Sequence, residues 1–165
     1  MRVSSDFPVD RPDTPSSFEL PDNAPARIRQ FHDLWMEKAA GSLPDAAHFD
    51  LKVLGADYPL LARIGVEGPD RKLHWREFTE APHWPFGPPV RDRPVAESIP
   101  PLSVKRVVNA FKETLESGIP DYFETTSWLQ GGRTVSLARL VAPIAAGAGR
   151  ELIALWEIME PPSAP

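Results

Sequence analysis

Cysteine is absent from this 165-residue chain, and the chain has no long hydrophobic run. Without cysteine, disulfide bonds and thiol chemistry are excluded, and a reducing compartment is the natural setting. No window approaches the roughly 18 consecutive apolar residues that a membrane span needs. No early segment joins basic residues to an apolar run, as a secretory signal does. The sequence therefore predicts a soluble cytoplasmic protein with no membrane partner.

Excess positive charge and the common catalytic motifs are also lacking. The formal net charge is −5, of which residues 1–25 contribute −3, so the remaining body is nearly neutral. A nearly neutral body has no electrostatic footprint for nucleic acid. The chain contains no glycine-rich phosphate loop, no His-Glu-x-x-His helix and no Gly-x-Ser-x-Gly elbow. We therefore expect no nucleic-acid partner, no cofactor, no metal and no catalytic residues.

Proline is abundant and marks the limits of the domain. Residues 1–25 hold five prolines and many acids, which predicts a mobile tail, with a partner-binding strip around Phe7 or residues 18–20 as the alternative. A second short tail is expected at residues 160–165, which leaves one domain over residues 26–159. Seven prolines in residues 82–101 exclude a regular helix or a central strand there. We expect Trp84 and Phe86 to fill the core at this loop, and the alternative is a lid over a pocket.

A hairpin at residues 121–143 is the strongest structural signal. Two β-rich runs, residues 122–130 and 133–142, flank Gly131-Gly132, which is typical of a two-residue turn. That turn predicts a register with Glu124 opposite Arg139 and an antiparallel pair covered on both faces. In this register one face is bulky and the other is small: Tyr122, Trp128, Val135, Leu137 and Val141 against Thr125, Ser127, Ser136 and Ala138.

Hydrophobic periodicity supplies the other elements. Apolar spacing predicts an amphipathic helix at 26–40 and a long helix at 104–117, which Ser103 is expected to cap. A short helix capped by Asp50 is predicted at 51–57, and strands are predicted at 60–66 and 72–78. Residues 151–159 are apolar on both faces, so this strand should lie centrally. The predicted fold class is α+β, with a five-stranded antiparallel sheet and one long helix before the last three strands.

Two surfaces follow from the predicted register. A small-molecule site is expected between the long helix and the small face of the hairpin, at Trp75, Phe111, Leu115, Thr125, Ser127, Ser136 and Ala138. The helix at 26–40 is expected to cover the bulky face, on a surface that two copies share, through Ile28, Phe31, Leu34, Trp35, Tyr122, Trp128 and Leu137.

Two polar patterns leave alternatives open. Lys105 and Arg106 begin the long helix, where a cationic turn with free amide groups can hold an anion, although solvated side chains are the simpler interpretation. Asp45, His48 and Asp50 form a loose metal-like pattern, but turn formation and helix capping explain both aspartates.

The order of elements resembles a PAS domain. The opening stretch is similar to a family of small stand-alone alphaproteobacterial PAS proteins, with a helix that bears Trp35, a Gly-x-Leu-Pro turn at 41–44 and the pair Phe49-Asp50. The chain departs from that family after Arg76, where Glu77-Phe78-Thr79 stands in place of a glycine-containing motif. The resemblance implies sensing through a ligand or a protein partner, with a homodimer expected and no catalysis within the domain. The cysteine used in flavin photochemistry and a histidine on the long helix for haem are both missing.

Two other functional classes remain as alternatives. One is a ligand-free module for dimerisation or assembly. The other is a small enzyme of the NTF2-like type, for which Asp121 or Glu124 with His74 would be the acid-base pair.

Overall fold

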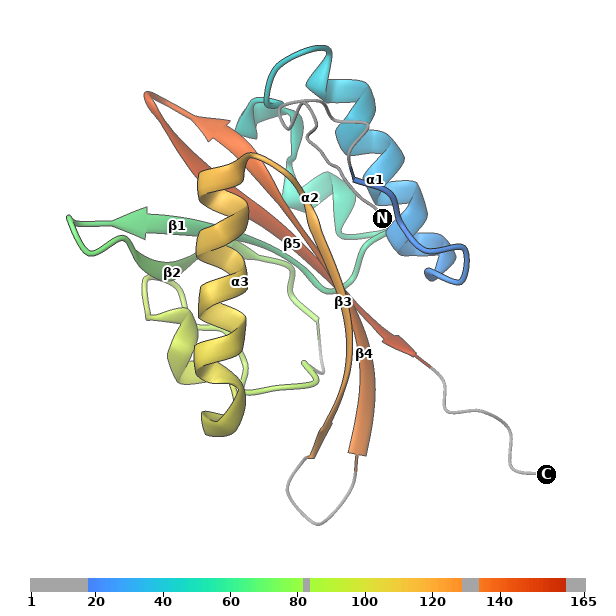
Figure 1. Cartoon of the computed structure of the whole chain (residues 1–165), viewed down its shortest axis with the longest axis vertical. Coiled ribbons are helices and arrows are strands. Elements are labelled where there is room, and N and C mark those ends of the chain that lie inside the picture. The colour runs from blue at the N-terminus through green and yellow to red at the C-terminus, as the bar shows by residue number, and fades with distance from the viewer. Residues whose placement is uncertain (1–17, 82–83, 129–133, 160–165) are drawn as a thin grey trace, which may run out of the picture.

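A five-stranded antiparallel sheet forms the centre of the computed structural model, which describes residues 18–81, 84–128 and 134–159 (Figure 1). The strand order is β2-β1-β5-β4-β3. The strands are β1 (Leu61–Glu67), β2 (Lys72–Phe78), β3 (Asp121–Trp128), β4 (Thr134–Ala146) and β5 (Gly149–Met159). The helices are α1 (Ala26–Ala39), α2 (Leu51–Leu54) and α3 (Val104–Ser117), with short 3-10 helices at Ala46–His48, Val95–Ser98 and Pro101–Ser103. The predicted α+β class, the five-stranded antiparallel sheet and the order of elements predicted from the sequence are confirmed.

β5 occupies the middle of the sheet because both of its faces are apolar. Leu152, Ala154 and Trp156 alternate with Ile153 and Leu155, and all five are buried. β5 pairs with β1 on one side and with β4 on the other, both antiparallel. The central position predicted for this strand is confirmed, since a strand buried on both faces needs a cover on each.

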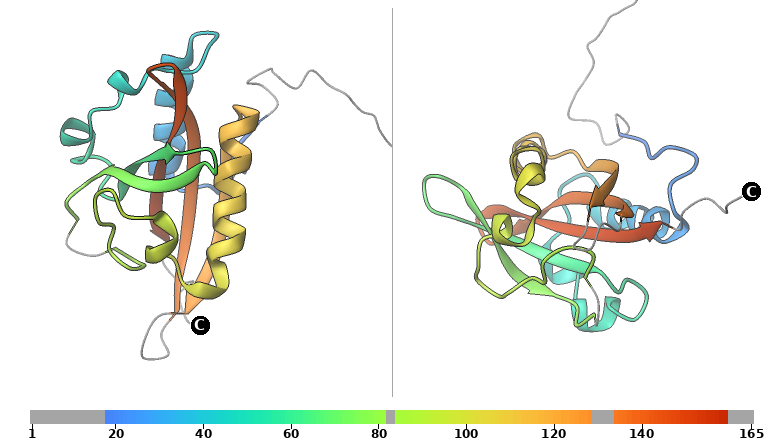
Figure 2. Two further views of the ribbon diagram at one scale, coloured as in Figure 1. Left: turned by 90° about the vertical axis from the view of Figure 1, so that its left-hand side faces the viewer. Right: turned by 90° about the horizontal axis from the view of Figure 1, so that it is seen from below.

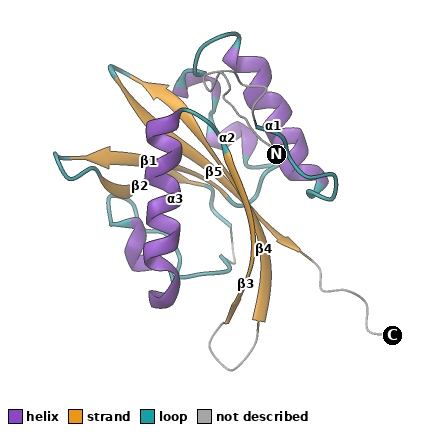
Figure 3. Cartoon of the chain, in the orientation of Figure 1, coloured by secondary structure: helices purple, strands orange, loops and turns teal. Residues whose placement is uncertain are grey.

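Two helices provide those covers from opposite sides of the sheet (Figures 2 and 3). α1 packs Ile28, Phe31 and Trp35 against β4 and β5, and the Trp35 Nε1 donates a hydrogen bond to the Pro143 carbonyl at 2.9 Å. α3 packs Val107 and Phe111 against the other face. The sheet therefore separates two hydrophobic cores, the α1-side core and the α3-side core.

The register predicted for the β3–β4 hairpin is wrong by one residue. Glu124 lies opposite Ala138, and Arg139 lies opposite Phe123. Trp128 pairs with Thr134, so an odd number of residues joins the paired ends, and a two-residue turn in regular register requires an even number. The Gly131-Gly132 turn itself lies outside the described residues. Side chains alternate between the two faces along a strand. This shift therefore places on opposite faces of the sheet the β3 and β4 side chains that were predicted to share one face.

The segment before α1 packs onto that helix. The Phe18 ring lies edge-on to His32, with 5.2 Å between the ring centroids, and Arg29 Nη2 donates to the Pro21 carbonyl. Phe18 and Leu20 are half-buried against the α1-side core. Residues 18–25, which the proline content assigned to a mobile tail, therefore extend the ordered layer around α1. Residues 1–17 and 160–165 lie outside the described part of the chain.

Candidate functional site

A small cavity lies on the α3 side of the sheet, at the start of α3. Its volume is about 40 Å³. The first turn of α3, the strands β3, β4 and β5 and the irregular segment 85–100 line it. The residues that line it and carry the argument below are Phe86, Ser103, Arg106, Thr125, Arg139 and Trp156.

Arg139 is the unusual member of this lining, because an arginine side chain is rarely buried. The residue is 5% exposed, and its guanidinium carbon lies 5.1 Å from the Phe111 ring centroid and 5.5 Å from that of Phe123. Its nearest acid is Asp121, whose Oδ2 is 3.6 Å from Nη2, beyond normal hydrogen-bond length. Its Nε is buried and has no hydrogen-bond partner among the described residues. Burial lowers the pKa of Arg139, and Asp121 opposes this effect.

The first turn of α3 brings a second cation to the same cavity. Ser103 occupies the N-cap position, but its side chain makes no capping hydrogen bond, contrary to the prediction from sequence. The first turn contains no acidic residue. Arg106 lines the cavity and lies over the Phe123 ring at 5.2 Å. A helix N-terminus carries a partial positive charge, so the cavity lies among three positive groups.

Aromatic side chains close the remaining side. Phe86 stacks on Trp75, with 6.1 Å between the centroids and an 8° interplanar angle, and it lies 5.1 Å from Trp156. Trp84 packs edge-on to Trp156. Trp75 Nε1 donates to Ser98 Oγ at 3.1 Å, which anchors the 3-10 helix at Val95–Ser98 beside β2. Trp84 and Phe86 are half-buried and pack against the α3-side core, but neither is a fully buried member of it, so they cover the core at this loop rather than fill it.

The seven predicted ligand-site residues do not share one surface. Trp75, Phe111, Leu115 and Thr125 are all on the α3 side of the sheet, and Thr125 lines the cavity. Ala138 is buried in the α1-side core, and Ser136 shares its face of β4, with its Oγ 3.3 Å from Thr126 Oγ1. The side chain of Ser127 is outside the described set. The one-residue register shift is the reason for this division.

The residues predicted to form a shared interface are also divided. Ile28, Phe31 and Trp35 are buried, and they pack within the α1-side core of the same chain. Leu34 and Tyr122 are half-buried against that core, whereas Leu137 faces α3. The side chain of Trp128 is not described. α1 does cover an apolar sheet face, but it covers Leu140 and Ile144 rather than Leu137 and Val141.

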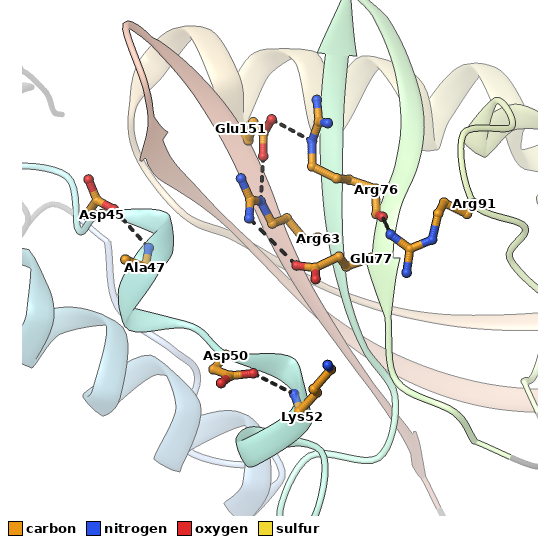
Figure 4. Close-up of polar contacts among 9 residues, drawn as sticks. All are labelled: Asp45, Ala47, Asp50, Lys52, Arg63, Arg76, Glu77, Arg91 and Glu151. Carbon is orange, nitrogen blue, oxygen red and sulfur yellow. Dashed lines mark hydrogen bonds and ion pairs between the residues drawn. The ribbon is translucent and has the colours of Figure 1, made fainter.

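A polar cluster lies on β1, β2 and β5 (Figure 4). Arg63 Nε donates to Glu151 Oε1 at 2.6 Å, and Arg76 Nε lies 2.7 Å from Oε2 of the same carboxylate. Glu77 Oε1 is 3.7 Å from Arg63 Nη1. The acids and bases of this cluster lie within ion-pair distance of one another, which makes it a structural ion-pair network, although Arg76 Nε meets its acid outside hydrogen-bond geometry.

The alternative sites considered from sequence are not assembled. Asp45 Oδ1 and Asp50 Oδ1 accept hydrogen bonds from the Ala47 and Lys52 amides, so both are caps, and this confirms the prediction for Asp50 (Figure 4). In the described part of the chain, no three acidic or histidine side chains gather as metal ligands. His74 on β2 and Asp121 on β3 occupy opposite edge strands, roughly 19 Å apart at one strand spacing per step. Glu124 accepts a hydrogen bond from Tyr122 and is not the partner of Arg139.

A larger and more open cavity of about 200 Å³ lies at the other end of α3, beside Trp35, Leu43 and Ile119. Its charged residue, Arg150, donates to the Leu115 and Glu116 carbonyls at the end of α3, so its charge already has acceptors. Arg139 has no such acceptor for its Nε within the described ranges. The cavity at the start of α3 is therefore the better candidate.

Sequence reasoning missed Arg139 because it assigned this residue to Glu124 across the hairpin. One signal was available: Arg139 is the lone charge in the run Leu137–Ile144, which is otherwise apolar or proline. A single cation in such a run indicates a buried charge that needs a partner. Arg106 was noted as part of a cationic first turn, but nothing in the sequence indicated that it and Arg139 line one cavity.

No helix in the described residues is both long enough and apolar enough to cross a membrane. In comparisons with known proteins, no family model and no curated protein matches the chain. Among solved structures, the light-state structure of the blue-light photoreceptor Aureochrome1 LOV is similar, with 15% sequence identity and a TM-score of 0.44. The match covers 68% of this chain and 90% of that one. A similarity of this size carries no argument about function, and the fold assignment rests on the strand order of the chain itself.

Proposed function

We propose that this chain is a PAS-type sensory or regulatory module that binds a small molecule between the sheet and α3. The order of elements supports this proposal, as does the resemblance of the opening stretch to the stand-alone alphaproteobacterial PAS proteins. The acid-base pairs considered from sequence lie on opposite edges of the sheet, which favours binding over catalysis.

The observation that carries the proposal is the cavity at the start of α3. It is enclosed by segments from three parts of the chain, it has mostly apolar walls, and a few polar groups converge on it. This combination is the usual form of a small-molecule site. The proline-rich segment covers the cavity, and its aromatic side chains can shift without breaking a helix or a strand. A bound ligand can therefore change the conformation of this segment at the protein surface.

The output of such a module is a protein contact, and α1 is the element that supports a contact best. α1 covers the face of the sheet opposite the cavity, and Arg27 Nη1 contacts both carboxylate oxygens of Glu157 on β5 at 2.9 Å. β5 also carries Trp156, which lines the cavity. One central strand therefore connects the cavity to the α1 layer. The partner that we propose for the α1 layer is a second copy of the chain, which would give a homodimer, or a signalling protein.

Native mass spectrometry of the purified protein, followed by a thermal-shift screen with metabolites, tests the proposal. We expect retained or added ligand to raise the melting temperature. Thr125→Leu fills the cavity and should abolish the shift. Thr126→Leu is the matched control, because it makes the same change on the next residue of β3, whose side chain is exposed on the other face.

A ligand-free assembly module is the second candidate, since Trp84 and Phe86 pack against the α3-side core and leave only a small cavity there. For that function, no compound would shift the melting temperature, and Thr125→Leu would raise stability by filling space. A dimer by light scattering together with these two results would favour assembly and contradict the sensory proposal.

A further inference from the structure

We propose that the ligand of this cavity is a small planar oxyanion, of the size and shape of a short-chain carboxylate. This inference rests on the proposed function, because it names the class of ligand for the same cavity. It follows from the charge, the unpartnered groups and the dimensions of the cavity.

The first step is the charge of Arg139. A guanidinium is not deprotonated in proteins, so the buried side chain brings a positive charge to the cavity wall. The faces of the guanidinium are covered by the rings of Phe111 and Phe123, which leaves its N–H edges as the groups that need acceptors. Asp121 is a weak acceptor for them, since it is 3.6 Å away and its side chain is 43% exposed. A buried donor without an acceptor is destabilising, and more so when it is charged.

The second step is the start of α3. The first amide of α3, that of Val104, donates to the Pro101 carbonyl of the preceding 3-10 helix, and Ser103 adds no cap from its side chain. The start of α3 therefore contributes the partial positive charge of its aligned peptide dipoles. Arg106, one turn into the helix, adds a second cation to the same wall. Arg139 faces this terminus from the sheet, so the two features are independent and point to the same space. No acidic side chain is among the residues that line the cavity.

The third step is the size of the cavity. A volume of about 40 Å³ holds roughly three water-sized groups, which suits an anion of about four heavy atoms and excludes a nucleotide or a haem. The N–H fork of a guanidinium matches both carboxylate and phosphate oxygens. The small volume and the apolar lining favour the smaller of the two, a short-chain carboxylate. The lining also contains the apolar side chains of Phe86, Ile99 and Trp156, which suit a short alkyl group.

Acetate and acetamide are the probes that test this inference, because they share size and shape and differ in charge. At constant ionic strength, acetate should raise the melting temperature saturably, and acetamide should not. In a ¹⁵N spectrum, acetate should shift the side-chain Nε–H signal of Arg139. That signal is assigned through correlations along the Arg139 side chain in the unmodified protein, so the measurement does not depend on the folding of any variant.

Three substitutions locate the effect. Arg106→Gln should weaken acetate binding several-fold, while Lys105→Gln removes the same charge from the same turn, does not line the cavity, and should leave binding close to that of the unmodified protein. Asp121→Asn removes the carboxylate that competes for Arg139, so acetate should bind more tightly. If Asp121 is instead the complete counter-ion of Arg139, acetate would have no effect on the unmodified protein, and Asp121→Asn would destabilise it.

The outcomes separate this inference from the proposed function. A neutral compound whose thermal shift is lost in Thr125→Leu, with no response to acetate, formate or bicarbonate, would overturn the oxyanion and keep the sensory module. No response to any compound would overturn both. Equal effects of acetate on the Arg106→Gln and Lys105→Gln variants would also overturn the inference, because the anion would then lie elsewhere.

Discussion

Phe111 links α3 to the sheet at the level of a single side chain. It is fully buried, and its ring lies under the guanidinium of Arg139. We expect Phe111→Ala to lower the free energy of unfolding by about 3–5 kcal/mol, the usual cost of deleting a core aromatic. Urea titration measures this. Leu102→Ala is the control, since Leu102 is fully exposed and its truncation should change stability by less than about 0.5 kcal/mol.

His32, on α1, should make the stability of the folded chain depend on pH. Burial lowers the pKa of His32, Asp33 partly opposes this effect, and Nε2 has no hydrogen-bond partner among the described residues. The unfolded chain therefore takes up a proton near the ordinary pKa, and the folded chain does so only at lower pH. Stability should be complete above the ordinary histidine pKa and should fall as the pH drops below it.

Replacing His32 tests that sign. In His32→Gln, the loss of unfolding free energy between about pH 7.5 and about pH 5.5 should be smaller than in the unmodified protein. His48→Gln, at an exposed position in the 3-10 helix Ala46–His48, should keep the full pH dependence. Equal pH dependence in the His32 and His48 variants would show that His32 is as well solvated in the folded chain as in the unfolded one.

Among the elements, α1 is held to the sheet by both apolar contact and one buried hydrogen bond. Trp35→Phe keeps most of the contact area and leaves the Pro143 carbonyl without its donor, which should cost about 1–3 kcal/mol. Trp35→Ala removes the ring as well and should cost about 3–5 kcal/mol. Chemical denaturation of the two variants separates these contributions. If Phe and Ala cost the same, the ring contributes no packing energy.

The register of the β3–β4 hairpin can be tested with cysteine pairs, because the chain has no cysteine of its own. Thr126 and Ser136 are cross-strand partners with hydroxyl oxygens 3.3 Å apart, so cysteines at both positions should form a disulfide under mild oxidation. Cysteines at Thr126 and Leu137 would pair in the register that a two-glycine turn predicts. Intact mass and non-reducing electrophoresis distinguish the two, and a disulfide only in the second pair would contradict the observed register.

For the molecule as a whole, the sheet is stable in water only when both faces are covered. Deleting residues 1–40 removes α1 and exposes the apolar face formed by Leu140, Ile144, Ile153 and Leu155. An apolar patch of that kind promotes aggregation, so this fragment should aggregate or melt at a much lower temperature. Deleting residues 1–17 should have little effect, because every described core residue follows that point. Light scattering and thermal melting compare the fragments, and a monodisperse 41–165 fragment of full stability would refute the role given to α1.

Local pattern was enough to locate the helices and strands. The 3.6-residue spacing of apolar side chains identified α1 and α3, and the two apolar faces of residues 151–159 identified the central strand before any contact was known. These features depend on neighbours along the chain, so sequence carries them directly. The missing cysteine and the high proline content likewise set the limits of the chemistry and of the regular structure.

The site depended on tertiary structure, because it is made of contacts between distant residues. A shift of one residue in the β3–β4 register placed Arg139 on the α3 side, opposite Phe123 rather than Glu124, and placed Ala138 on the α1 side. The cavity forms where the first turn of α3 meets β4 and the proline-rich segment, three parts of the chain whose separate patterns hold no information about one another. Sequence by itself determined which elements exist and that both faces of the sheet are apolar. Only the packed structure decided which side chains share a face, because alternation along a strand turns one step of register into a complete exchange of faces.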